Sequence, residues 1–249
     1  MSSTFEVLFG PAEYQARRNG GFIGSVCVVF DVLRATSVML TGLANGAAGF
    51  IPVEEISGAI AMRTKYPGAL LAGERDGLRI TAAQSGGVGF DLGNSPREYL
   101  PGRVEGRTII STTTNGTRAL RACASAKRVA VCSFLNLSAT AQWLSGLNPQ
   151  RVVLVCAGTA EFPALEDILC AGALCEIATG VVLDDSAEVA RRTYIQGQGN
   201  LIGAVAAARN ASRLLANTEL RDDVEWCLRR DVYKFAAILG DDGVVRRAE

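Results

Sequence analysis

Five small residues follow one another at a corner of the sequence where a β-rich run changes into a helical pattern. The stretch is IISTTTNGTRAL (residues 109–120), and its small residues are Thr113, Thr114, Asn115, Gly116 and Thr117. A helix N-terminus has unpaired N–H groups and a partial positive charge, and both attract anions. We therefore predict that these residues bind a phosphate or sulfonate group of a substrate. A plain helix cap formed by Asn115 or Thr114 is the alternative.

A carboxylate and a guanidinium follow another apolar run. In VVFDVLRAT, Asp31 comes directly after the run and Arg34 stands about one helical turn later. A carboxylate there could ligate Mg²⁺ or attack phosphorus, and an arginine can hold a phosphate with two hydrogen bonds. We expect both residues to be catalytic. The haloacid-dehalogenase pattern Asp-x-Asp has Leu33 in its third position here, so a covalent aspartyl-phosphate at Asp31 is the less supported alternative. A capping role for Asp31 also stays open.

Other polar groups stand after further apolar runs or in the long Gly-rich loop 74–106. Those predicted to bind substrate are Arg75, Asn94, Ser95, Asn136 and Thr159. Glu74, Asp76 and Asp91 are hard oxygen ligands. Besides Asp31, the residues predicted to bind a metal are Glu74, Asp91, Glu166 and Asp167, and Asp91 is also predicted to be catalytic. Mg²⁺ prefers oxygen ligands and retained waters, which suits such a site.

The composition limits the chemistry further. The 249 residues include no histidine, which excludes a Ser-His-Asp triad, a phosphohistidine and histidine-ligated zinc. Carboxylates normally ionise well below neutrality, so we expect any activity limb near neutral pH to belong to the substrate phosphate. With 25 acidic and 25 basic residues and no basic run, nucleic acid is not an expected partner.

The cysteines and the N-terminus indicate the compartment. Seven cysteines, an odd number, lie mostly in apolar runs, which predicts reduced core thiols. The first residues lack the features of a signal peptide, and no apolar stretch approaches the ~20 residues that a membrane span requires. We therefore expect a cytoplasmic protein with no membrane partner.

Alternating apolar runs and helical patterns must position these corners. Strands are predicted at residues 4–9 (at one edge of the sheet), 26–30, 49–53, 69–73, 107–111, 128–133 and 151–158. This spacing predicts an α/β fold, a three-layer α/β/α arrangement with a mostly parallel sheet, whose carboxyl ends gather the polar corners. The C-terminal third reads as helix-rich, including 201–218 and 221–239. We expect a single domain over 1–249, with a helical subdomain over 165–249 as the alternative.

Six motifs in order, over roughly residues 5–175, resemble the 2-phosphosulfolactate phosphatase family: FDVLRAT, GERDG, GFDLGNSP, TTTNGTRAL, SFLN and CAGT…LEDILCAG. The resemblance implies an α/β layered protein that uses Mg²⁺ to hydrolyse 2-phospho-3-sulfolactate to 3-sulfolactate and phosphate, a step of coenzyme M biosynthesis. We therefore expect a phosphatase for a small phosphorylated acid. An anion-binding or regulatory module without turnover is the alternative, and whether the protein forms a homo-oligomer stays open.

Overall fold

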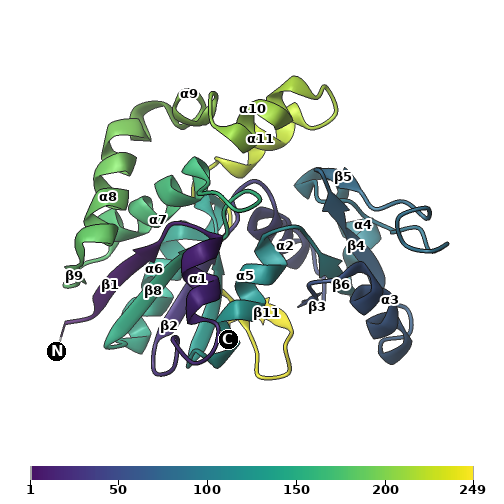
Figure 1. Ribbon diagram of the computed structural model, residues 1–249, viewed down its shortest axis with the longest axis horizontal. Coiled ribbons are helices and arrows are strands. Elements are labelled where there is room, and N and C mark those ends of the chain that lie inside the picture. The colour runs from purple at the N-terminus through teal and green to yellow at the C-terminus, as the bar shows by residue number, and fades with distance from the viewer. Residues whose placement is uncertain (1, 249) are drawn as a thin grey trace.

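Two groups of parallel strands form most of an eleven-stranded sheet in the computed structural model, which describes residues 2–248 (Figure 1). The first group contains, in spatial order, β7 (Arg128–Cys132), β2 (Val26–Phe30), β8 (Arg151–Cys156), β1 (Thr4–Leu8) and β9 (Val182–Leu183). The second contains β3 (Gly49–Pro52), β6 (Thr108–Thr112) and β4 (Leu70–Arg75), with β5 (Leu78–Arg79) antiparallel at the edge. All seven strands predicted from apolar runs are present within two residues of their predicted ends, although β9 lies outside β1 at its edge.

A C-terminal hairpin joins the two groups. Its strands, β10 (Ala237–Leu239) and β11 (Val245–Arg247), pair antiparallel with β7 and β3 respectively. The predicted helix over 221–239 is therefore wrong in its second half, because α11 (Arg221–Cys227) ends at Cys227. A short apolar run such as Ala236–Leu239 fits a helix or a buried strand equally well by pattern. Here it forms the strand that continues the ladder beyond β7.

Helices cover both faces of the sheet, which confirms the predicted three-layer α/β/α fold with a mostly parallel sheet. The convex face carries α6 (Leu137–Leu147), α7 (Leu165–Ile177), α8 (Asp185–Gly197) and α3 (Ile56–Lys65). The concave face carries α1 (Pro11–Arg17), α2 (Ala35–Ala44) and α5 (Gly116–Ala122). Shorter helices are α4 (Pro101–Val104), η1 (Pro96–Glu98), η2 (Cys123–Ser125), η3 (Phe134–Asn136) and η4 (Gln198–Asn200).

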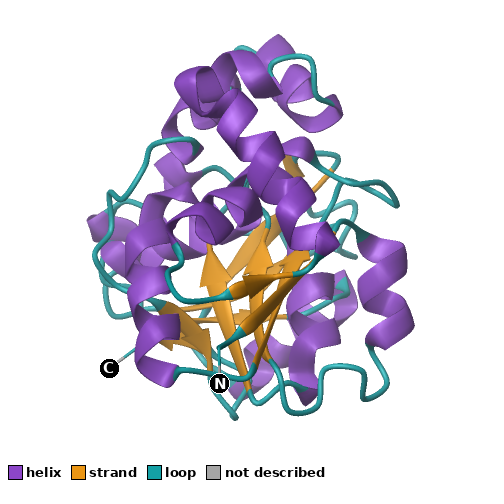
Figure 2. Cartoon of the chain, turned by 90° about the vertical axis from the view of Figure 1, so that its left-hand side faces the viewer, coloured by secondary structure: helices purple, strands orange, loops and turns teal. Residues whose placement is uncertain are grey.

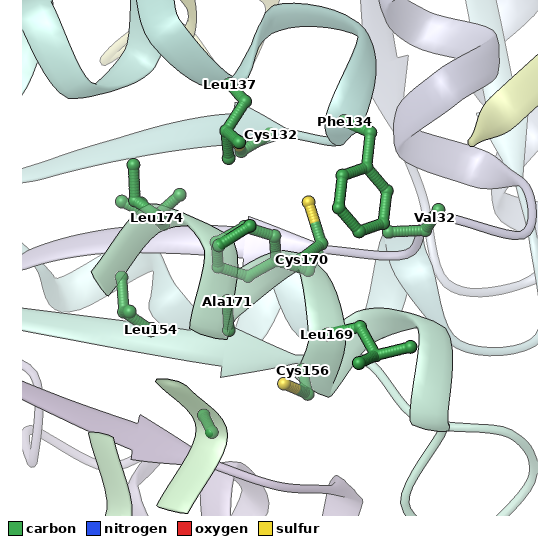
Figure 3. Close-up of a cluster of buried hydrophobic side chains, with 14 of the residues drawn as sticks. Val32, Cys132, Phe134, Leu137, Leu154, Cys156, Leu169, Cys170, Ala171 and Leu174 are labelled. Carbon is green, nitrogen blue, oxygen red and sulfur yellow. The ribbon is translucent and has the colours of Figure 1, made fainter. Parts of the chain in front are cut away.

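The cysteines lie in these cores. Cys132 of β7, Cys156 of β8 and Cys170 of α7 pack among Phe134, Leu154 and other apolar side chains (Figure 3). All seven cysteines are buried and unpaired, which confirms the prediction of free core thiols.

The sheet is strongly curved. Five strand-to-strand steps separate β2 from β6, which would place their ends roughly 24 Å apart in a flat sheet. A Cβ atom added to Gly116, four residues after β6, would nevertheless lie 2.6 Å from Oδ2 of Asp31, which directly follows β2. The curl encloses α2 and α5 and brings polar corners from distant strands together.

The helices that follow α8 lie beyond the carboxyl ends of the strands. The predicted helix over 201–218 is divided into α9 (Leu201–Val205) and α10 (Arg209–Ala216), and α11 follows. Figure 2 shows the central strands pointing towards this helical layer. Within residues 2–248, no helix combines the length and the apolar character needed to cross a bilayer.

Candidate active site

A polar pocket lies where the carboxyl ends of β2, β4, β6 and β8 meet the C-terminal helices. Its lining consists of Asp31, Leu33, Arg34, Glu74, Asp76, Gly77, Asn94, Thr114, Asn115, Gly158, Thr159, Ala160, Asn210 and Arg213. Many of the predicted site residues are therefore brought together here. Two further lining residues, Asn210 and Arg213, were not predicted from the sequence; they come from α10.

Asp31 is buried at the end of β2. Its Oδ1 atom accepts a hydrogen bond from the Ala35 amide at 3.0 Å, at the start of α2. Burial raises its pKa to about 7, and the nearby charges of Glu74 and Glu166 act in the same direction. The expectation that the carboxylates ionise well below neutrality is wrong for this residue. Because a Cβ at position 116 would lie 2.6 Å from Asp31 Oδ2, only glycine fits there without displacing the carboxylate.

Glu74 ties two loops together at the end of β4. Its Oε1 atom accepts hydrogen bonds from the Thr114 amide (2.8 Å) and hydroxyl (2.9 Å), and Oε2 accepts one from the Gly77 amide (2.7 Å). Both oxygens are thus used within the protein. The predicted metal ligand Glu74 acts in the structure as the connector between the corners after β4 and β6.

The small residues of the opening corner are largely bonded to one another. The Thr117 hydroxyl donates to the Thr113 carbonyl at 2.9 Å, and each amide of this pair approaches the other's hydroxyl. Asn115 donates to the carbonyls of Ala157 (3.3 Å) and Ala160 (2.8 Å), which fastens the loop after β8. These contacts explain why one corner holds so many hydrogen-bonding groups. Substrate binding by this corner stays a prediction.

Arg75 does not line this pocket, although its neighbour Thr114 does. Its guanidinium donates to the Glu74 carbonyl at 2.7 Å and to the Thr112 hydroxyl at 3.1 Å. It lines a separate polar hollow that it shares with Thr113 and Thr114.

Two adjacent carboxylates at the start of α7 have different environments. Asp167 accepts from the Val32 amide (2.8 Å) and from the Gly158 amide (3.0 Å), so it joins the loops after β2 and β8. Glu166 accepts at Oε1 from Asn210 (3.0 Å), whereas its buried Oε2 atom has no hydrogen-bond partner in the described part of the chain. Burial raises the pKa of both carboxyl groups.

Arg34 is held by a buried ion pair. Its Nη1 atom donates to Asp223 Oδ2 at 2.7 Å, and Nη2 donates to the Gly77 carbonyl at 2.6 Å. Ser95 donates to the other Asp223 oxygen at 2.7 Å. The predicted phosphate clamp Arg34 and the predicted substrate ligand Ser95 are therefore both engaged with α11.

The structure does not bring Asp91 to the pocket. Its amide donates to the Leu71 carbonyl, and its carboxylate accepts from the Leu71 amide, both at 2.8 Å. The chain then runs parallel to β4, with Ala72 bridged to Leu92, so Asp91 stays near the start of that strand and Asn94 reaches its carboxyl end. A catalytic or metal-binding role for Asp91 has no geometric support.

Asn136 also lies elsewhere. It forms a reciprocal capping box with Ser133, and its amide donates to the Val131 carbonyl at 3.2 Å. It is fully buried at the end of β7. Its role is to cap η3 and hold the turn after that strand.

The sequence did not predict three residues: Asn210 and Arg213, which line the pocket, and Asp223, which binds Arg34. No motif marks them, since they stand in a segment with an ordinary helical pattern. The available signal is the spacing in RNASR, which places Asn210 and Arg213 three apart on one helix face.

Carboxylate oxygens without a hydrogen-bond partner are the atoms of this site that suit Mg²⁺. Among residues 2–248, no three carboxylates or thiols are grouped so as to form an all-protein metal cage. Within residues 2–248, Asp31 Oδ2 and the buried Glu166 Oε2 accept no hydrogen bond. The charge of Glu166 raises the pKa of Asp31, so the two carboxylates are near each other. Mg²⁺ is commonly held by one or two carboxylates together with waters and substrate phosphate. Asp31 and Glu166 fit that mode of binding.

Comparison with known proteins agrees with this arrangement. The chain matches the family model described as 2-phosphosulpholactate phosphatase over residues 14–242, a span that includes α10. A probable 2-phosphosulfolactate phosphatase of Caldanaerobacter subterraneus subsp. tengcongensis is 41% identical over 229 residues, covering 89% of this chain and 90% of the relative. Proteins of the same name from Caldicellulosiruptor saccharolyticus and Clostridium acetobutylicum are 39% and 36% identical, and each match covers 83% of this chain and 86% of the relative. The chain therefore belongs to the 2-phosphosulfolactate phosphatase family, a family of phosphoric monoester hydrolases.

Proposed function

We propose that this protein is a Mg²⁺-dependent phosphatase that hydrolyses the phosphate monoester of a small anionic 2-phospho acid. The relatives' name suggests 2-phosphosulfolactate, which would give 3-sulfolactate and phosphate. The observation that supports the proposal most is a pair of buried carboxylates at a polar pocket of a phosphatase-family protein. Asp31 lines the pocket, and Glu166 is bonded through Oε1 to the lining residue Asn210, while its buried Oε2 atom has no hydrogen-bond partner in the described part of the chain. Two such carboxylates suit one divalent cation shared with a phosphate.

The roles of the side chains follow from their surroundings. Asp31 and Glu166 would hold the cation, and its charge would lower the raised pKa of both groups so that they bind in the ionised form. When bound, Mg²⁺ supplies positive charge that polarises the phosphoryl group and offsets the charge developing on it. Asn94 lines the pocket with its amide facing no hydrogen-bond partner among the described residues, and it can donate to a phosphate oxygen.

The attacking water needs a proton acceptor. The chain contains no histidine, and all seven cysteines are buried in the cores, so we expect a carboxylate of the pocket to serve as the base. Asp76 lines the pocket and is exposed, and its carboxylate makes no hydrogen bond or ion pair in the described part of the chain. We assign it as the base most available to a water in the pocket. The buried unpaired cysteines support a reducing compartment, which we take to be the cytoplasm.

Phosphate release from 2-phosphosulfolactate tests the proposal directly. We expect turnover with Mg²⁺, loss of turnover in excess chelator, and recovery when Mg²⁺ is restored. Asp31→Asn should reduce kcat by at least about a thousandfold. Asp91→Asn is the matched control, because the same chemical change at a residue outside the pocket should leave kcat within about twofold. Full activity in excess chelator would contradict the metal-dependent mechanism.

The same assay separates water attack from a covalent intermediate. With ³²P-labelled substrate, acid-quenched enzyme should carry no label if water attacks directly. Label that remains on the unmodified enzyme but is absent from Asp31→Asn would instead support the aspartyl-phosphate route.

A further inference from the structure

The pocket contains two arginines, and a carboxylate neutralises only one of them. Arg34 pairs with Asp223 at 2.7 Å, and both side chains are at most 2% exposed. Arg213 is exposed and makes no ion pair within the described residues. Its single hydrogen bond there runs from Nη2 to Asn210 Oδ1 at 2.9 Å. Most of the Arg213 guanidinium is therefore available to a ligand.

Asn210 fixes Arg213 relative to the carboxylates. Its Nδ2 atom donates to the Leu33 carbonyl (2.5 Å) and to Glu166 Oε1 (3.0 Å), while its Oδ1 atom accepts from Arg213. One buried amide thus connects the loop after Asp31, the candidate cation ligand Glu166 and the free guanidinium. Arg213 is therefore connected through Asn210 to Glu166, one of the two residues proposed to hold the cation.

The turn after β4 lies next to the Arg213 guanidinium. A Cβ atom at Gly77 would lie 3.7 Å from Arg213 Cζ and 3.8 Å from Arg34 Nη2, and Gly77 has φ +80°. The backbone can therefore pass close to both guanidinium groups. Arg213 belongs to α10, which lies above the strands in Figure 1. Asp31 and Glu74, which line the same pocket, come instead from the ends of β2 and β4.

The charges of the pocket define what Arg213 can bind. Asp31, Glu74 and Asp76 line the pocket, and Glu166 lies next to it, so an anion is repelled except at the cation position and at the free guanidinium. A guanidinium donates two parallel hydrogen bonds to a planar or tetrahedral oxyanion. A substrate with one anionic group on the cation would therefore place its second anionic group on Arg213.

We propose that Arg213 is the specificity-determining residue for the second anionic group of the substrate, a carboxylate or sulfonate on the carbon skeleton. This inference rests on the proposed phosphatase function and deepens it. Asn210 is the positioning residue that holds the guanidinium. Arg213 makes no hydrogen bond to either proposed cation ligand, so we expect its effect to be on the choice among phosphate esters.

Three phosphate esters separate the candidates. They are 2-phospho-3-sulfolactate, with a carboxylate and a sulfonate; 2-phospholactate, with the carboxylate only; and isopropyl phosphate, with neither. In Arg213→Ala we expect the ratio of kcat/KM for 2-phospho-3-sulfolactate over isopropyl phosphate to fall about 10- to 100-fold, mainly through KM. If the ratio for 2-phospholactate over isopropyl phosphate falls as well, the bound group is the carboxylate. If that ratio is unchanged, the bound group is the sulfonate.

Two variants control for charge and fold. Arg209→Ala removes the same charge from the same helix, but Arg209 stacks on Phe162 at 4.0 Å and does not line the pocket, so its ratios should equal those of the unmodified enzyme. Arg213→Lys should restore part of the lost selectivity. If all three substrates lose activity in proportion in Arg213→Ala, Arg213 acts on the phosphate or the carboxylate cluster and the inference is overturned. If the unmodified enzyme hydrolyses none of the esters, the proposed function itself fails.

Discussion

Arg34 and Asp223, 189 residues apart in the chain, form a buried ion pair that fastens α11 to the loop after β2. Asp223 also accepts from Ser95 at 2.7 Å and from Arg97 at 2.8 Å, so one carboxylate joins three segments. Removing one partner of a buried pair leaves an uncompensated charge. We expect Asp223→Ala to lower the free energy of unfolding by about 3–5 kcal/mol, measured by urea denaturation. A double variant, Arg34→Met with Asp223→Leu, should be less destabilised than Asp223→Ala alone, and equal losses would show that the orphaned charge is not the cause.

Asp31 predicts a pH dependence of stability in the metal-free enzyme. Its pKa rises from 3.8 to about 7 on folding, mainly through burial, so the native state binds a proton that the unfolded state releases. This contribution to stability is full below about pH 4 and is lost as the pH rises through about 7, a total on the order of 4 kcal/mol. In chelator, urea denaturation of Asp31→Asn at pH 5 and pH 8 should show a smaller loss of stability than the unmodified enzyme. If the free energy of unfolding falls equally in the two proteins between pH 5 and pH 8, the pKa of Asp31 is not raised in the folded state.

Glu166 and Asp167 are neighbours with different predicted roles, and they can be compared directly. Glu166→Gln keeps the acceptor for Asn210 but removes the charge beside the unpaired oxygen, so the Mg²⁺ concentration for half-maximal activity should rise at least about tenfold. Asp167→Asn places an amide donor against the Val32 or Gly158 N–H, so it should mainly lower the melting temperature. If Asp167→Asn raises the Mg²⁺ requirement more than Glu166→Gln does, then Asp167 and not Glu166 is the cation ligand.

Gly116 tests the contact between the corner after β6 and Asp31. A methyl group there would lie 2.6 Å from Asp31 Oδ2 and 2.7 Å from the Ala35 Cβ. We expect Gly116→Ala to cost about 1–3 kcal/mol of stability and to reduce kcat, because the carboxylate must move. Gly102→Ala, in α4 with no atom within 4 Å of the added Cβ, is the control and should change neither quantity. Normal kcat in Gly116→Ala would mean that the position of Asp31 is not critical.

Thr117 distinguishes a helix cap from a substrate cradle. Its hydroxyl donates to the Thr113 carbonyl, and it does not line the pocket. Thr117→Ala should therefore cost about 1–2 kcal/mol of stability with kcat/KM almost unchanged. If the hydroxyl instead donates a hydrogen bond to the transition state, its loss should raise the activation free energy by about 2–4 kcal/mol, and kcat/KM should fall accordingly. Melting curves and kinetics of the same variant decide between the two roles.

The sequence by itself determined the order of the strands and helices along most of the chain and the polar character of their corners. These are local properties: buried parallel strands require continuous apolar runs such as VCVVF and RVVLVC, and loops after such strands carry the side chains that face solvent. It also excluded histidine chemistry by composition. Local pattern was insufficient for Ala237–Leu239, whose strand exists because β7 offers an unpaired neighbour.

Only the tertiary structure decided which corners meet and which oxygens stay free. The curl of the sheet brings Gly116 against Asp31, and α10 delivers Arg213 from a segment remote in the chain. Because residues 91–94 run parallel to β4, Asn94 lies at the carboxyl end of that strand and lines the pocket, whereas Asp91 lies near its start. Local sequence shows that a residue is a carboxylate, an arginine or a threonine. Its pKa and its availability to a ligand depend on burial and on partners such as Asp223 for Arg34, and these are set by long-range packing.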